Sequence, residues 1–320
     1  MNTISTKKDT SIIFFALLGS IAYGSFVVAS LERLYFLGSG DVNDLVIFFD
    51  NIDIFVLNNN YSVISGDGLF RLLVLYLGNL FNAENLTVLS YIAFVFSSIA
   101  FGICTVNIRS SKHLIYVLPL LLMVFFSPNV INLYASSVRS GIAFTLLLLA
   151  ITNRNAGIRY ILLGLSSLMH LSMVPLVSFY FLFHILRDRR FNVSSVSSYF
   201  LLVLYSFSIA TFAYIYQYNV TTSNSSIYFN FLTFCLALLL LFTSKKAIKN
   251  VFGFISVGII LIVIAGNFLD LSFSRYTGNA VFFYLFFLIK EPNTNAIKVF
   301  SLGYAPYFAL TTFFSMANQL

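Results

Sequence analysis

The chain has 320 residues and a net charge of +7; 59% of its residues are hydrophobic, 9% are charged, and its mean hydropathy is +0.91. Ordinary soluble domains are roughly 45–50% apolar and about 25% charged, so this composition excludes a soluble globular protein. The positive charge is explained better by anchors in cytoplasmic loops than by nucleic-acid binding. The sequence contains no P-loop, GxGxxG or CxxC pattern, which argues against a nucleotide-driven pump.

Apolar runs recur along the chain, and many reach the length of about 20 residues that crosses a bilayer core. The first follows Lys7 and Lys8 and is too long for the core of a signal peptide, so we predict a retained helix. The runs are continuous, unlike the alternating strands of a membrane barrel, and therefore predict an all-α, polytopic integral membrane bundle. They cover 11–30, 86–106, 114–127, 139–151, 160–186, 199–216, 227–243, 251–269, 279–289 and 299–316, with a weaker amphipathic run at 68–81.

The segments between these runs differ in charge, and this difference predicts their side of the membrane. Short basic loops stay in the cytoplasm. The basic segments are 107–113, 152–159, 187–190, 244–249 and 290–298. The acidic or neutral segments, which we place outside, are 31–67, 127–137, 217–226 and 270–279.

Two runs must deviate from simple crossings if every basic loop is cytoplasmic. Residues 68–81 then form a helix on the outer face, and 160–186 enters and returns as a re-entrant element, broken near His170 and Pro175. The alternative is two full crossings, one with thin hydrocarbon. The sequence shows no internal repeat, so we predict one transmembrane domain, 1–320, with about nine to eleven transmembrane helices.

Arg139 lies where a segment of small polar residues meets a segment of pure hydrocarbon. A charge inside a membrane is costly and marks a functional candidate. At a helix start, backbone N–H groups also favour an anion, and Ser136, Ser137 and Ser140 add hydroxyl groups. Arg139 is therefore a candidate phosphate or diphosphate ligand. The alternative is a cation whose side chain snorkels to the interface.

Arg275 repeats this arrangement between two later apolar runs, with Tyr276 beside it. The planar guanidinium can bind two phosphate oxygens at once, and the tyrosine ring could stack on a sugar. A tyrosine at the membrane interface is equally ordinary. Both residues are candidates for substrate binding.

Asp67 and Arg71 are four residues apart at the start of the amphipathic run 68–81. On a surface helix such a pair is common and contributes little to stability. In a cleft at the membrane face, the same pair could bind a sugar hydroxyl, and Asp67 could act as a base.

His170 lies inside an apolar run, five residues before Pro175. A membrane histidine often hydrogen-bonds a neighbouring helix, but its near-neutral pKa also makes it a candidate proton acceptor. Four acids upstream, at Asp41, Asp44, Asp50 and Asp53, could hold a cation or form a solvated loop; we assign no metal to them.

Residues 136–177, SSVRSGIAFTLLLLAITNRNAGIRYILLGLSSLMHLSMVPLV, resemble EpsG-type, Wzy-like O-antigen polymerases. The shared pattern is an Arg-x-Gly-Ile-Ala helix start, a short basic loop, and an apolar run ending in His. DNIDIF and GDGLFRLL upstream are similar too, as is Arg275-Tyr276. The sequence departs at Ser140 and Leu171, where many relatives have Gln and Pro.

The resemblance implies a glycosyltransferase of the C-type helical class in the bacterial inner membrane, with a periplasmic active face. It would join undecaprenyl-diphosphate-linked oligosaccharide repeats, donor to acceptor, in O-antigen, lipopolysaccharide or related polysaccharide biosynthesis. A chain-length regulator would be a further protein partner, and membrane lipid surrounds the chain.

Our working hypothesis is that Arg139 and Arg275 hold the donor diphosphate, while His170 or Asp67 takes the proton of the acceptor hydroxyl. Direct attack would invert the anomeric carbon, and no cofactor is needed because the diphosphate linkage carries the energy. The alternatives are a flippase or other transporter, and an O-antigen ligase or another lipid-dependent glycosyltransferase.

Overall fold

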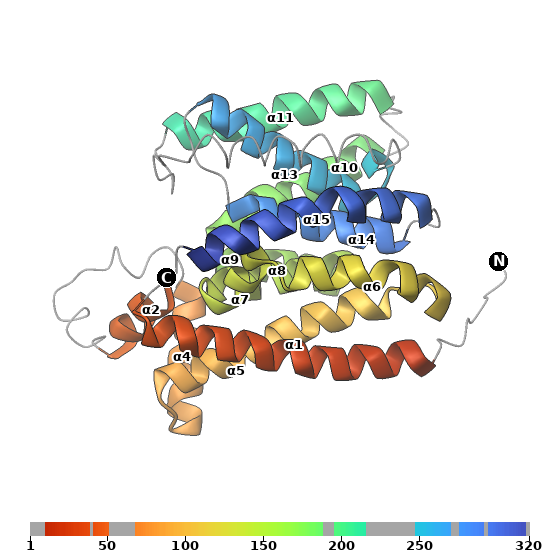
Figure 1. Ribbon diagram of the computed structural model, residues 1–320. Coiled ribbons are helices and arrows are strands. Elements are labelled where there is room, and N and C mark those ends of the chain that lie inside the picture. The colour runs from red at the N-terminus through yellow and green to blue at the C-terminus, as the bar shows by residue number, and fades with distance from the viewer. Residues whose placement is uncertain are drawn as a thin grey trace. The chain divides into compact units, whose positions relative to one another are not determined.

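The computed structural model describes residues 10–38, 41–50, 68–187, 195–215, 247–269, 275–290 and 294–317. All regular secondary structure in these ranges is helical (Figure 1), which confirms the predicted all-α class. The chain divides into two compact units. Unit 1 comprises residues 1–111 and 131–177, and unit 2 comprises 112–130 and 178–320.

Unit 1 is built around two antiparallel helix pairs. Its helices are α1 (Thr10–Phe36), α2 (Asp41–Asp50), α4 (Gly68–Phe81), α5 (Asn85–Val106), α8 (Val138–Thr152), α9 (Ala156–Met169) and the 3₁₀ turn η2 (Leu171–Met173). Helix α1 packs along α5, α5 packs on α8, and α8 packs on α9. Helix α4 contacts both α5 and α9.

Small residues allow α1 and α5 to approach closely. The Ser98 hydroxyl of α5 donates to the carbonyl of Ser20 in α1 at 2.9 Å, and Gly102 lies against the Ser20 side chain. Interfaces rich in small and hydroxyl residues are typical of membrane helix pairs. On its other face α1 exposes large side chains such as Phe14 and Leu17, which suits contact with lipid.

Unit 2 has a core of helices that are apolar on every side. Its elements are α6 (Ser111–Phe125), α10 (Val174–Arg187), α11 (Ser195–Ile215), η3 (Ala247–Lys249), α13 (Val251–Phe268), α14 (Arg275–Lys290) and α15 (Thr294–Ala317). Nearly all described residues of α14 are buried, as expected for a helix without a polar face. The Ser256 hydroxyl of α13 donates to Ala280 O of α14 at 2.7 Å.

Three described helices are long and apolar enough to cross a membrane: α1, α5 and residues Ser197–Ile215 of α11. Helix α6 and the following α7 (Pro128–Ala135) make a fourth span if they count as one segment, bent by 59°. The chain is therefore a helical membrane protein. Six further apolar helices in the described ranges are shorter, so nine to eleven crossings stay a prediction, as does a single domain.

Two local expectations are confirmed and two helices were not anticipated. Residues 68–81 form a helix, α4, and the run 160–186 breaks at His170 between α9 and η2. Whether it re-enters the membrane stays a prediction. Helix α2 lies in the acidic segment and α7 in the segment 127–137, both expected to be loops. The apolar run 227–243 lies outside the described residues.

Candidate functional site

A tight corner between α7 and α8 positions Arg139. The α8 glycine Gly141 allows the end of α7 to approach, because a Cβ there would lie 2.6 Å from a ring carbon of Tyr134 and 2.8 Å from the carbonyl oxygen of Leu133. The Tyr134 hydroxyl is hydrogen-bonded to the buried hydroxyl of Thr145 at 3.0 Å. The first turn of α8 is therefore held by packing on one side and by a hydrogen bond one turn further on.

The serines around Arg139 contribute to this corner through their backbones. The N–H groups of Ser136 and Ser137 both donate to Asn132 O, at 3.1 and 2.9 Å, and Ser140 N–H donates to Ser137 O. These three amides donate within the turn and the start of the helix, so they are not available to bind a ligand. Arg139 itself is half-buried in the first turn, where backbone N–H groups lack carbonyl partners within the helix.

The pairing of α8 with α9 brings Arg139 and His170 to the same end of unit 1. A three-residue connection, 153–155, joins the two helices, which makes them antiparallel neighbours. The buried Ser166 hydroxyl of α9 donates to Ala143 O of α8 at 2.7 Å, which fixes their register. Arg139 lies four residues before Ala143, and His170 lies four residues after Ser166. Each is therefore about 6 Å from this hydrogen bond, in the same direction.

His170 ends α9 and is half-buried. Its backbone is extended, with φ −158° and ψ 119°, and its N–H donates to Ser166 O. Its carbonyl accepts from Met173 N–H at 3.0 Å, which starts the 3₁₀ turn η2. Because η2 contacts α8, the break directs the chain back across the helix that carries Arg139.

Arg71 belongs to the same unit, on α4, whose contacts with α9 place it beside the hairpin. This helix buries Phe70 and Val74 completely, while Leu72 and Tyr76 are each 65% exposed. Its apolar residues thus occupy both a protein-facing and an outward-facing side. Asp67, the proposed partner of Arg71 and candidate base, lies outside the described residues.

Arg275 and Tyr276 belong to unit 2, where they begin α14. Arg139 and His170 belong to unit 1. A diphosphate site shared by Arg139 and Arg275 therefore stays a prediction. Next to Arg275 and Tyr276 is a polar cluster that the sequence did not indicate, in which Thr277 and Tyr307 are buried and Asn129 is half-buried. Asn129 Nδ2 donates to the Tyr307 hydroxyl at 3.2 Å, and Thr277 is also hydrogen-bonded to Tyr307.

The acidic segment before α4 has a structural role at one of its carboxylates. Asn85 Nδ2 donates to Asp50 Oδ1 at 2.8 Å, which links the end of α2 to the start of α5. Asp44 is exposed, and Asp53 lies outside the described residues. Within the described ranges, no three His, Cys, Asp or Glu side chains converge as a metal site would require.

Comparisons with protein-family models, with curated proteins and with solved structures gave no match. The resemblance to O-antigen polymerases therefore stays a prediction. The described geometry supplies a guanidinium and an imidazole at one end of a helical hairpin in a membrane protein. A guanidinium can hold an anionic group and an imidazole can accept a proton.

Proposed function

We propose that this protein is a polysaccharide polymerase, a glycosyltransferase that joins undecaprenyl-diphosphate-linked oligosaccharide repeats. The observation that carries the proposal is the register of α8 and α9, which sets Arg139 and His170 at the same end of their hairpin. We place that end at the periplasmic face of a bacterial inner membrane, because the opposite end of the hairpin is basic and belongs in the cytoplasm. Arg154 lies in the connection there, and Arg159 lies in the first turn of α9.

In this proposal Arg139 binds the diphosphate of the donor lipid. The acceptor sugar's hydroxyl attacks the anomeric carbon of the donor, the bond to the diphosphate oxygen breaks, and the carbon inverts. His170 or Asp67 takes the hydroxyl proton. Arg139, joined by Arg71 or Arg275, stabilises the charge that develops on the departing diphosphate, and Tyr276 contacts a sugar. Electrostatic stabilisation of this kind is usually the largest catalytic contribution.

The proposal is tested by the size distribution of surface polysaccharide in the host. We expect deletion of the gene to collapse long chains to a core with one repeat unit. Complementation by Arg139→Ala should leave about 1% or less of the wild-type activity, because loss of a charge-stabilising group costs on the order of 10² to 10³ in rate. Whichever of His170→Ala and Asp67→Ala causes a loss of about 10² to 10⁴ identifies the base. Arg139→Lys should recover only part of it, because an ammonium lacks the bidentate fork.

Matched controls use the same residue types away from the proposed site. Arg154 is exposed in the connection at the opposite end of the same hairpin, and His184 is exposed on α10. Arg154→Ala and His184→Ala should complement fully at equal membrane levels. If Arg139→Ala makes polymer of normal length, the proposal is wrong. If deletion also removes the single repeat, the protein acts in export or ligation instead.

A further inference from the structure

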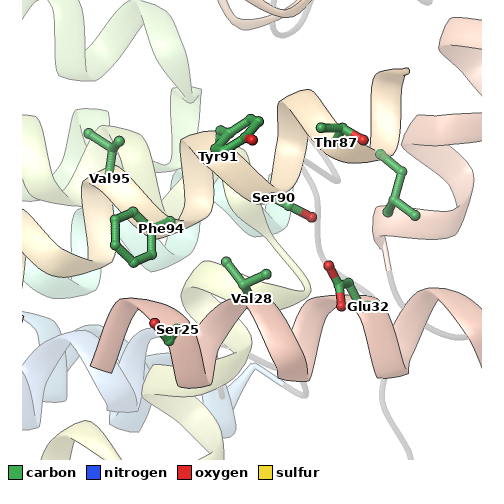
Figure 2. Close-up of a pocket in the computed structure, with 9 residues that line it drawn as sticks. Ser25, Val28, Glu32, Thr87, Ser90, Tyr91, Phe94 and Val95 are labelled. Atoms are coloured by element: carbon green, nitrogen blue, oxygen red, sulfur yellow. The ribbon is translucent and has the colours of Figure 1, made fainter. Parts of the chain in front are cut away.

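A groove of about 630 Å³ runs between α1 and α5 in unit 1 (Figure 2). Its volume is within the range of about 300–1,000 Å³ typical of small-ligand sites. The wall combines polar residues, Glu32, Thr87 and Ser90, with apolar residues, Val28, Phe94 and Val95. Neither the proposed diphosphate site nor the sequence patterns account for it.

The carboxylate of Glu32 and the Thr87 hydroxyl lie at one end of the groove. Helices α1 and α5 are antiparallel, so Glu32 near the end of α1 faces Thr87 in the first turn of α5. Figure 2 shows these two residues at one end and Phe94 and Val95 at the other. From Glu32 to Ser25, the α1 lining residue furthest from it in sequence, the groove extends about 10 Å along the helix.

Ser90 has a buried hydroxyl that lacks a hydrogen-bond partner among the described residues. The residue is 9% exposed, and its oxygen points from α5 into the space between the helices, on the side of Glu32 (Figure 2). Neighbouring serines of α5 are satisfied: Ser97 donates to Phe94 O and Ser98 to Ser20 O. A buried hydroxyl without a partner is costly, so a ligand that supplies one would be favoured.

The chemistry of the wall selects among possible ligands. The groove is lined by one carboxylate and several hydroxyls, and its lining contains neither lysine nor arginine. A phosphate head would therefore be repelled by Glu32 without a compensating cation. Sugar hydroxyls donate readily to a carboxylate and exchange hydrogen bonds with serine and threonine. Tyr91, which is 67% exposed on the groove wall, offers a ring face to the C–H side of a sugar.

The polar part of the groove lies at the depth of Arg139. The Thr145 hydroxyl of α8 contacts Phe96 O of α5 at 3.3 Å, which aligns the two helices. Both helices start at the same end of unit 1 (Figure 1). Six residues before this contact are Ser90 on α5 and Arg139 on α8. Ser90 and Arg139 are therefore at the same level along the helix axes.

We propose that the groove between α1 and α5 binds an uncharged sugar of the acceptor glycan. Glu32, Thr87 and Ser90 hydrogen-bond its hydroxyls, and Tyr91 contacts its ring. This inference rests on the proposed polymerase function and deepens it. The two substrates then bind at sites of opposite charge. The anionic diphosphate binds Arg139, and the neutral sugar binds Glu32.

Binding can be tested directly because the chain has no tryptophan. Tyr91→Trp introduces a single fluorophore on the groove wall. The full-length variant, reconstituted in phosphatidylcholine nanodiscs, is titrated with octyl β-D-glucoside, octyl phosphocholine and octyl sulfate. We expect a saturable fluorescence change with the glucoside alone. A response that is absent, or equal for all three head groups, overturns the proposal.

Two further substitutions identify the groups involved. Glu32→Gln should weaken glucoside binding about tenfold, as expected for the loss of a hydrogen bond to a charged group. The control Glu84→Gln, at an exposed carboxylate before α5 that does not line the groove, should change it less than twofold. Ser90→Ala should weaken binding yet raise the unfolding temperature of the ligand-free protein. Equal effects of both glutamate variants, or unchanged binding in Ser90→Ala, contradict the proposal.

The acceptor role has its own readout in the host. If deletion shortens the polysaccharide but Glu32→Gln restores chains of normal length, the groove is not the acceptor site and the polymerase function stands. If deletion leaves the polysaccharide unchanged, the polymerase function itself fails, and the acceptor role with it. Short chains from Glu32→Gln at normal membrane level, together with weakened glucoside binding, support both.

Discussion

Gly141→Ala provides a sharp test of how the fold positions Arg139. The added methyl carbon would lie 2.8 Å from the carbonyl oxygen of Leu133 and 2.6 Å from a ring carbon of Tyr134. The Tyr134 ring is buried and its hydroxyl is hydrogen-bonded to Thr145, so neither neighbour can yield without a shift of α7. The substituted position is two residues from Arg139, so the strain would reach the first turn of α8 that carries it.

Overpacking of a well-filled site typically costs about 1–3 kcal/mol. Displacement of Tyr134 would also weaken its buried hydrogen bond, a loss of about 0.6 kcal/mol for an average membrane interhelical bond. We therefore expect Gly141→Ala to lower the free energy of unfolding by about 2–3 kcal/mol. Reversible unfolding of the detergent-solubilised protein measures this loss, and polysaccharide length in complemented cells should fall with it.

Gly164→Ala is the matched control, because it makes the same substitution on the neighbouring helix. No atom outside its own helix lies within 4 Å of a Cβ built at Gly164, and alanine is favoured over glycine inside a helix by roughly 0.5–1 kcal/mol. This variant should be unchanged or slightly more stable. If Gly141→Ala proves as stable as Gly164→Ala, the tight α7–α8 corner does not exist in the folded protein.

Three further substitutions test separate contacts. Ser166→Ala removes the hydrogen bond to Ala143 O. It should lower the free energy of unfolding by about 0.6–1.7 kcal/mol and reduce polymer length. An unchanged unfolding midpoint would contradict the α8–α9 register. Gly253→Ala places a methyl group against the backbone of Ala247. It should lower the yield of folded protein more than Gly258→Ala, whose nearest neighbour is the side-chain ring of Phe179. Size-exclusion chromatography checks this order. Asn85→Ala removes an exposed bond to Asp50 and should change stability by less than about 0.5 kcal/mol; a larger loss by the same unfolding assay would mean that α2 is essential to unit 1.

Local features of the chain were predictable where a proline or an apolar repeat determines whether the backbone is helical. A break near His170 was expected because Pro175 has no backbone N–H and cannot donate to the carbonyl four residues earlier in a continuous helix. Helix α4 was expected because its apolar residues repeat with helical spacing. Arg139 and His170 were considered together because the resemblance to O-antigen polymerases includes both an Arg-x-Gly-Ile-Ala helix start and a later apolar run that ends in His.

Helices α2 and α7 were missed because acidic and polar residues in their segments suggested loops. The signal was present in α2: Val42, Leu45, Val46 and Phe49 repeat at helical spacing and are all buried. The acids gave these segments the composition of an outer loop, but the apolar face determines where the chain packs. In α7, Tyr134 is buried and contacts Gly141 of α8.

The groove between α1 and α5 could not be predicted from the sequence. Ser90, Ser97 and Ser98 look equivalent within one apolar run, and only the packing of α1 decides which hydroxyls find acceptors. Ser98 finds the carbonyl of Ser20, and Ser97 bonds within its own helix. Ser90 is buried beside the groove instead. Whether its hydroxyl finds an acceptor therefore depends on α1, which is far away in sequence.

A single physical constraint explains why Arg139, His170 and Glu32 all lie near helix ends. In hydrocarbon a guanidinium, a carboxylate or an unpaired hydroxyl is costly, and the cost falls where a side chain can reach water. Arg139 in the first turn of α8, His170 at the end of α9 and Glu32 near the end of α1 all occupy helix ends. Helix ends near the interface therefore hold such groups with less loss of stability than the middle of a span would.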